Sequence, residues 1–388
     1  MTFFLVASAI KVFIVFNLIM VGVALLTLLE RRVCAWMQDR LGPNRVGPQG
    51  LLQPAADGLK NFLKEETSPA MADKTLFTLA PIVSFVPALL TFGVIPFASP
   101  LPTQWGTVDM VVADLPIGFL YILAISSLGV YGIVLAGWAS NNKYALLGGL
   151  RASAQMISYE IALGMSTVPV LLLAGNVTLT RVIAQQQHAH AWFIIPLTLA
   201  FVIFFISALA ETNRLPFDLP EAEGELIAGY HTEYSAMKFS MFYIAEYSNM
   251  VTASALMATL FFGGWDVPFT SWDSTGDPTV IKTLVTFASF GLKTFVFLFT
   301  FIWVRWTLPR FRYDQLMALG WKVLLPMTLF YITILAVAIW FFRNRLGLDY
   351  GPGMAWALGG INVALLVALV WLLDRGRIVS GSVAQETA

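Results

Sequence analysis

The sequence has few charged residues and almost no cysteine. Asp, Glu, Lys and Arg make up 12% of its 388 residues, about half of their usual share of roughly 25% in soluble domains. Cys34 is the only cysteine, which excludes an internal disulfide and an iron–sulfur cluster held by four thiolates of this chain. His188, His190 and His231 lack zinc-ligand spacing. The chain also lacks the G-x-G-x-x-G and G-x-x-x-x-G-K-[ST] loops that bind nucleotides, and it has no basic tract typical of nucleic-acid binding.

Long hydrophobic runs fill most of the chain. Hydrophobic residues make up 58% of it, and the mean hydropathy is +0.75. A bilayer core needs about 20 apolar residues of helix, and the runs are continuous rather than alternating, which argues against a β-barrel. We therefore predict an all-α, polytopic integral membrane protein, a single membrane domain over residues 1–388. The expected transmembrane helices lie at about 3–29, 75–97, 116–138, 152–175, 192–211, 239–262, 283–304, 322–342 and 354–373.

The basic residues are distributed unevenly between the loops. If the loop after the first helix is cytoplasmic, seventeen Lys and Arg fall on that side and four on the other. This asymmetry follows the positive-inside rule. It predicts a multi-pass protein of the bacterial cytoplasmic (inner) membrane, with the N-terminus outside. The C-terminus and two large loops, 30–74 and 212–238, are predicted to be cytoplasmic.

The first large loop contains a predicted amphipathic helix. After Pro54, the apolar residues Leu59, Phe62 and Leu63 recur at helical spacing among charged residues. Such a helix either lies flat on lipid headgroups or packs against a partner subunit, with its charged face lining a shared cavity. The arginines of this loop suit lipid headgroups or a polar ligand that enters from the membrane.

The second large loop concentrates carboxylates. In DLPE, Asp218 at the N-cap and Glu221 at N3 could cap a helix. Capping does not explain Glu223, Glu225 and Glu233, for which the only nearby bases in the sequence are Arg214 and Lys238. Like charges raise each other's pKa, so such a cluster tends to hold some protons near neutral pH. A group of glutamates that share protons is what a proton relay needs.

Two further carboxylates lie inside predicted transmembrane helices. Glu160 and Glu246 follow the basic residues at the start of their helices by nine and eight positions, which is about 13 and 12 Å along a helix. Carboxylates within the membrane are costly and mark functional sites by default. The structural alternative is a buried ion pair, for which Lys293 is a candidate partner.

Three segments together resemble one protein family. They are ERRVCAWMQDRLGPNRVGPQGLLQPAADGLKNFLKEE, AETNRLPFDLPEAEGELIAGYHTEYSAMKFSMFYIAEY and RYDQLMALGWKVLLP. In this order they resemble the H subunit of the bacterial proton-pumping NADH–quinone oxidoreductase, respiratory complex I, over about residues 10–342. That family usually has eight transmembrane helices, so the run at 354–373 is an extra C-terminal helix for which the resemblance implies no function.

The resemblance implies a division of labour between subunits. This chain would form part of the quinone-binding (ubiquinone-type) chamber with the peripheral subunits B and D, beside the membrane subunits A, J and K and the antiporter-like subunits. Quinone would be its substrate, and flavin, iron–sulfur clusters and metal would belong to other subunits. The family positions at the quinone passage correspond to Glu30, Arg31, Arg40, Arg45, Asp57 and Lys60. Those of the acidic proton path correspond to Glu160, Asp218, Glu221, Glu223, Glu225, Glu233 and Glu246. Gly224 departs from the polar residue that is frequent in the family.

Two other classes of function compete with this one. A stand-alone proton-coupled secondary transporter would also contain carboxylates in the membrane, but it is expected to have broken helices in paired halves. A purely structural anchor would explain the amphipathic helix without requiring Glu160 or Glu246.

Overall fold

The computed structural model describes residues 2–104, 106–218, 229–268, 270, 272–273 and 277–374. These residues form a helical bundle with one small β-hairpin, in which β1 (Leu101–Thr103) pairs with β2 (Gly106–Val108). The hairpin is antiparallel, with Leu101 opposite Val108. The prediction of an all-α fold is confirmed.

A helix forms at each of the nine predicted hydrophobic runs. Seven helices among the described residues are long and apolar enough to cross a membrane. Of the other two, α7 has only 14 residues, and α8 carries Glu246 together with several Ser and Thr residues, which lower its hydropathy. The helices of the nine runs are α1 (Thr2–Met37), α3 (Lys74–Leu90), α4 (Gly118–Ala139), α5 (Lys143–Ala174), α7 (Thr198–Glu211), α8 (Ala236–Phe261), α9 (Val280–Thr307), α11 (Leu325–Leu346) and α12 (Pro352–Asp374).

Several boundaries differ from those expected from hydropathy. α1 continues to Met37, so Glu30 and Arg31 belong to the helix rather than to the loop. α5 begins at Lys143 instead of about residue 152, because the Asn142 side chain accepts a hydrogen bond from the Tyr144 amide (3.0 Å) and caps the helix. A polar helical turn has no hydropathy signal, so the sequence predicted shorter helices.

Short elements connect the long helices. The predicted amphipathic helix is confirmed as α2 (Gln53–Leu63), and the Leu59, Phe62 and Leu63 side chains of its apolar face are exposed. α6 (Leu179–Ala189) covers the far end of the bundle. The remaining short segments are η1 (Pro48–Gly50), η2 (Thr91–Val94), η4 (Gly229–His231), α10 (Tyr313–Ala318) and the π-helical η5 (Leu319–Leu324).

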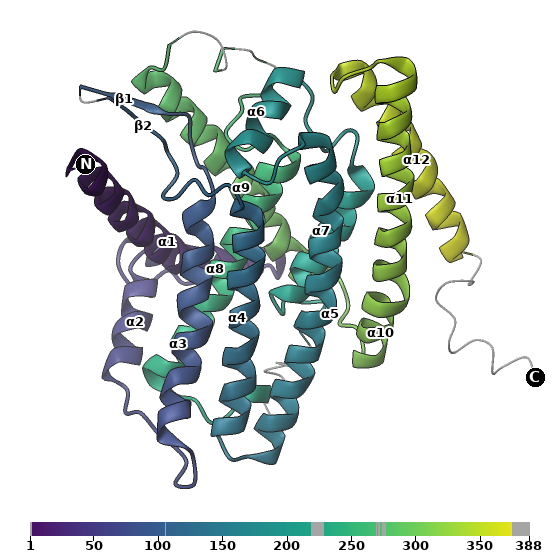
Figure 1. Cartoon of the computed structure of the whole chain (residues 1–388). Coiled ribbons are helices and arrows are strands. Elements are labelled where there is room, and N and C mark those ends of the chain that lie inside the picture. The colour runs from purple at the N-terminus through teal and green to yellow at the C-terminus, as the bar shows by residue number, and fades with distance from the viewer. Residues whose placement is uncertain are drawn as a thin grey trace, which may run out of the picture.

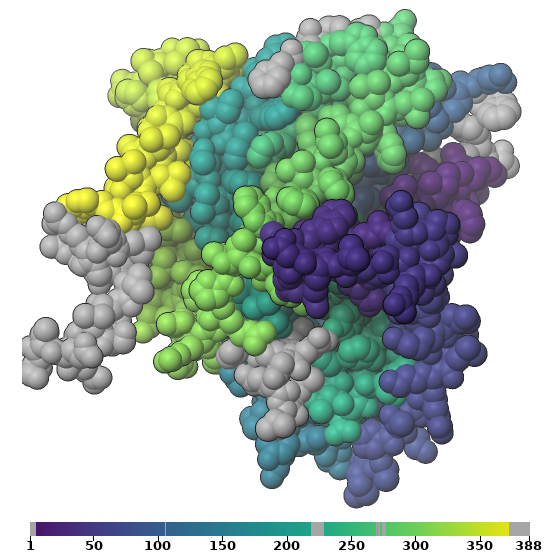
Figure 2. All heavy atoms as spheres, turned by 180° about the vertical axis from the view of Figure 1, so that it is seen from behind, coloured from purple at the N-terminus to yellow at the C-terminus, as the bar shows by residue number. Residues whose placement is uncertain are grey.

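The loops gather at two opposite ends of the bundle (Figure 1). The lower end holds α2, the α4–α5 turn and α10, and the upper end holds the β-hairpin and α6. α1 is steeply inclined to the upright α3, α4 and α5, and it lies across the rear face (Figure 2). α11 and α12 stand on the side opposite to α1.

The extra C-terminal helix is fixed to the bundle by buried polar contacts. Asn362 of α12 is fully buried, and its Oδ1 accepts a hydrogen bond from the Tyr331 hydroxyl of α11 (2.8 Å). Its Nδ2 donates to the carbonyls of Pro196 (2.5 Å) and Leu358 (3.0 Å). The Tyr350 hydroxyl also donates to the carbonyl of Ala191 (3.1 Å). α12 is therefore an integral part of this helical domain.

Candidate functional site: a buried ion cluster between two cavities

Arg214 lies at the centre of a buried cluster of charges near the lower end of the bundle. It follows α7 directly, and its side chain is 7% exposed. Its Nε lies 2.6 Å from Oε1 of Glu246 on α8, and its Nη1 lies 3.1 Å from Oε1 of Glu30 on α1. The guanidinium also stacks over the Tyr247 ring, 4.3 Å from its centroid. A planar guanidinium can bind two carboxylates at once, which a lysine ammonium does with less directional definition.

Glu30 receives two more partners from other helices. Arg305 of α9 forms an ion pair with its Oε1, and the Tyr247 hydroxyl of α8 donates to its Oε2 (2.7 Å). The side chain of Glu30 is only 5% exposed. A buried carboxylate is tolerated only where such partners replace water. The cluster therefore joins α1, α8, α9 and the turn after α7 through one network of charges.

Asp218 extends the charges toward the rest of the acidic loop. One of its carboxylate oxygens lies 3.1 Å from Nη2 of Arg310, which follows α9. Burial raises the pKa of Asp218, and the charge of Arg310 offsets part of this increase. Asp218 is therefore easier to protonate than an exposed aspartate, and its protonation state is controlled by an arginine on another segment.

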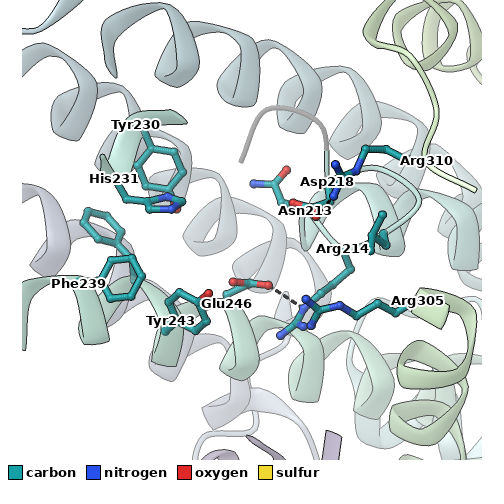
Figure 3. Close-up of a pocket in the computed structure, with 12 residues that line it drawn as sticks. Asn213, Arg214, Asp218, Tyr230, His231, Phe239, Tyr243, Glu246, Arg305 and Arg310 are labelled. Atoms are coloured by element: carbon teal, nitrogen blue, oxygen red, sulfur yellow. Dashed lines mark hydrogen bonds and ion pairs between the residues drawn. The ribbon is translucent and has the colours of Figure 1, made fainter. Parts of the chain in front are cut away.

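Two cavities lie on either side of this network. The inner cavity has a volume of about 230 Å³, and Figure 3 shows Glu246 between the Arg214–Arg305 side and the aromatic side formed by Tyr230 and His231. The outer cavity measures about 480 Å³ and lies between α1 and α9. Tyr243 and Arg305 line both cavities. The outer cavity is also lined by Thr27, Glu30, Arg31, Cys34, Ala35, Arg40, Leu41, Gly42, Pro43, Tyr247 and Trp306.

A third, small cavity continues from Glu246 into the bundle. It has a volume of about 40 Å³, and both Glu246 and Glu211 line it, together with Asn249. Glu211 also lies close enough to Glu160 of α5 for their charges to interact. The carboxylates Glu246, Glu211 and Glu160 thus form a series that leads away from the ion cluster.

The structure unites some of the predicted quinone-passage residues and separates one. Glu30, Arg31 and Arg40 line the outer cavity. Asp57 of α2 pairs with Arg31 (2.5 Å) and more loosely with Lys60 (3.9 Å), so it ties α2 to α1 at the mouth of this cavity. Arg45 is exposed and lines neither the inner nor the outer cavity.

The predicted proton-path residues are distributed over three places. Asp218 and Glu246 line the inner cavity, and Glu160 lies beyond the small one. Glu233 accepts a hydrogen bond from Asn142 (2.7 Å) and lines a different groove, near the α4–α5 turn. Glu221, Glu223, Gly224 and Glu225 lie outside the described residues, and so does the predicted helix capped by Asp218.

The suggested ion pair with Lys293 is wrong. The Lys293 ammonium lies at the other end of the bundle, where it donates to the carbonyls of Phe262, Gly264 and Asp266. Glu246 pairs with Arg214 instead. Sequence position could not choose between these two bases, because each requires a different neighbour of α8.

Sequence reasoning also missed several members of the site. The sequence marks Arg214 and Arg305 only as basic residues at helix ends, which is their commonest role. Glu211 and Tyr247 lie at the edges of apolar runs and have no distinguishing pattern. A signal was nevertheless present, since only one other Lys or Arg shares with Arg214 the loop between two runs that each hold a carboxylate. Among the described residues, no three His, Cys, Asp or Glu side chains are grouped as a metal site would require.

These features define a class: a polytopic helical membrane protein with a buried charge network between a lateral cavity and an internal one. Comparison with known sequences narrows the class. Residues 10–336 match the NADH dehydrogenase family, so the chain belongs to that family. The match ends before α12.

Relatives of known name cover most of the chain. It is 52% identical to the first of the numbered H subunits of NADH-quinone oxidoreductase of Geobacter metallireducens, over 84% of this chain and 94% of that protein. It is 50% identical to the H subunit of NADH-quinone oxidoreductase of Rickettsia typhi, over 88% and 96% respectively. NADH-ubiquinone oxidoreductase chain 1 of Chondrus crispus is also 50% identical, over 86% of this chain and 97% of its own.

Proposed function

We propose that this chain is the subunit of a proton-translocating NADH–quinone oxidoreductase that links the quinone chamber to the proton path. Peripheral subunits B and D would complete the chamber, and the redox centres would belong to other subunits. The relatives' names support the assignment to this enzyme. The observation that carries the coupling role is the position of Arg214, whose two carboxylate partners face different cavities.

The coupling follows from the charges of the site. Glu30 lines the outer cavity, which is open to a molecule that enters between α1 and α9. Quinone reduction draws protons and creates negative charge, and a nearby ion network responds by redistributing its pairs or protons. If Arg214 moves toward Glu30, Glu246 loses its counter-charge. Glu246 then takes up a proton, because a buried carboxylate without a partner favours its neutral form.

The proton would continue along the carboxylate series. Glu246 and Glu211 share the small cavity, and Glu211 interacts with Glu160. Glu221, Glu223 and Glu225 follow Asp218 in the sequence, and we propose that they join the path there. The chain performs no covalent chemistry in this scheme, since it supplies only charge and proton-binding groups.

Glu246→Gln tests this proposal in the assembled complex. The amide keeps the shape of the side chain but cannot take up a proton. We expect NADH–quinone turnover and proton pumping in membrane vesicles to fall at least tenfold, while NADH oxidation by a hydrophilic acceptor is unchanged. Glu65→Gln, an exposed position at the same end of the bundle, is the matched control. Normal pumping in Glu246→Gln, in a complex that assembles fully, would refute the relay.

A further inference from the structure

A second group of charges lies at the opposite end of the bundle, around Asp266 in the α8–α9 loop. Asp266 is 7% exposed, and its Oδ2 accepts a short hydrogen bond from the Trp192 indole (2.6 Å). The Lys293 ammonium of α9 holds this loop through the carbonyls of Phe262 (2.7 Å), Gly264 (3.0 Å) and Asp266 (2.6 Å). The site is separate from the ion cluster of Arg214 and has no place in the proposed relay.

The loop conformation brings Trp192 close to Asp266. Gly263 has a φ of +72°, and a Cβ at this position would lie 2.8 Å from Nε1 of Trp192. Only glycine allows both the turn and the approach of the indole. The fold therefore places Asp266 directly against the segment that follows α6.

Asp273 lies against Asp266 in the same loop. Its Oδ2 accepts hydrogen bonds from the Gln187 amide of α6 (2.9 Å) and from the Val267 backbone N–H (3.3 Å). Its Oδ1 is buried and receives no hydrogen bond from the part of the chain that the structure describes. The two carboxyl groups are within hydrogen-bond reach of each other. Two ionised carboxylates cannot form that bond, because both are acceptors only.

We propose that Asp266 and Asp273 bind one shared proton and thereby form a pH-dependent clamp between the α8–α9 loop, α6 and Trp192. A hydroxyl on Asp266 donates to Oδ1 of Asp273, which supplies the missing partner of this buried oxygen. Without the proton, two negative charges repel each other across the same contact.

The surroundings favour retention of the proton. Burial raises the pKa of Asp266 to about 6; the Trp192 hydrogen bond lowers it, and the charge of Asp273 raises it. Lys293 on α9 is the cation that faces the pair among the described residues, and α6 contributes only the neutral amide of Gln187. An exposed aspartate has a pKa of about 3.9. The proton therefore stabilises the closed clamp at acidic pH, and this stabilisation is lost as pH rises through about 6.

The location gives the clamp a physiological consequence that rests on the proposed function. The pair lies at the end predicted to face the compartment that receives the pumped protons. Acidification of that compartment would close the clamp and hold α6 against the α8–α9 loop. The shared proton itself does not depend on this interpretation.

Hydrogen–deuterium exchange on the assembled complex tests the clamp directly. Peptides that cover residues 186–193 and 262–268 are followed from pH 5 to pH 8, with rates corrected for intrinsic exchange. The difference between a pKa of about 6 in the closed state and about 3.9 in the open state predicts that wild-type protection falls about tenfold over this range. Asp273→Asn should lose this dependence, because its amide can donate to an ionised Asp266.

Asp277→Asn is the matched control, since Asp277 is exposed in the same loop. It should retain the wild-type profile. A flat profile in the wild type overturns the proposal even if the Asn variants fail to assemble, and so does an unchanged slope in Asp273→Asn. Neither result depends on quinone turnover, whereas Glu246→Gln tests the relay without reference to this loop.

Discussion

At the scale of single residues, Arg214 determines how the site is connected. It is buried, and it pairs with one carboxylate from α1 and one from α8. Removing one partner from a buried ion pair typically costs about 3–5 kcal/mol, because the other charge is left without compensation. The network is therefore held in one arrangement when unperturbed and responds strongly when one charge changes.

Arg214→Lys tests whether the forked geometry matters or only the charge. A lysine keeps the positive charge but cannot bind both carboxylates in the same plane. We expect NADH–quinone turnover to fall about tenfold or more in a complex that still assembles. Arg45→Lys, at an exposed arginine outside both cavities, should be silent. Equal turnover in the two variants would show that charge alone suffices.

Asp57 is predicted to control the mouth of the outer cavity. Asp57→Ala releases Arg31 and Lys60, so α2 loses its ion pair with α1. Quinone turnover should decrease several-fold, with a larger KM for a short-chain quinone. NADH oxidation by a hydrophilic acceptor provides the internal control, because this reaction takes electrons from other subunits. A parallel loss of both activities would point to failed assembly instead.

The Asp218–Arg310 pair predicts a pH shift with a defined sign. Arg310 lowers a pKa that burial has raised, so Arg310→Gln should raise the pKa of Asp218 further. Asp218 then stays protonated to higher pH, and any step that needs its ionised form moves to more alkaline pH. We expect the acidic limb of the turnover–pH profile to shift upward in Arg310→Gln and to be lost in Asp218→Asn. If Asp218 acts only as a helix cap, Asp218→Asn should be nearly silent, because Asn caps about as well as Asp.

At the scale of elements, α12 shows how an added helix is attached to an existing bundle. Its anchor is polar rather than apolar: Asn362 contacts both α11 and the segment before α7. Within a membrane, apolar side chains pack almost as well on lipid as on protein, so a buried amide fixes position and register better than leucine does. The helix contacts neither cavity of the ion cluster.

Asn362→Leu should therefore loosen α12 without affecting catalysis. It leaves the Tyr331 hydroxyl and the Pro196 carbonyl without their partner, at a cost of about 1–3 kcal/mol for each buried group. We expect faster hydrogen exchange in α12 and faster proteolysis after it, with normal quinone turnover. Asn344→Leu, at an exposed position on α11, is the control. A large loss of turnover in Asn362→Leu alone would give α12 a functional role.

At the scale of the whole molecule, the ion cluster and the carboxyl pair lie at opposite ends of the bundle (Figure 1). The loops that contain most of the basic residues gather at the end with α2 and α10, as expected if that end faces the cytoplasm. Single cysteines at Asn141 and Asp277, introduced after replacement of Cys34 by Ala, test this topology. A membrane-impermeant thiol reagent should label Asn141→Cys from the cytoplasmic side and Asp277→Cys from the outside. Labelling of both from one side would refute the topology.

The sequence by itself determined the helices and the type of chemistry. Apolar runs of about 20 residues require helices in a bilayer, since every backbone polar group must be satisfied within the segment. The cost of burying a carboxylate likewise marked Glu160 and Glu246 as exceptional before any fold was known. Both conclusions depend on local composition, which the sequence states directly.

Only the tertiary structure decided which charges meet. Arg214 pairs with Glu30, which lies 184 positions away in the sequence, and Lys293 caps a loop instead of pairing with Glu246. The shared contact of Asp266 and Asp273 depends on the turn at Gly263 and on the position of α6. Such pairings are set by how helices pack, and helix packing depends on side chains from several distant segments at once. For this reason the sequence could name the titratable groups of this protein but could not name their partners.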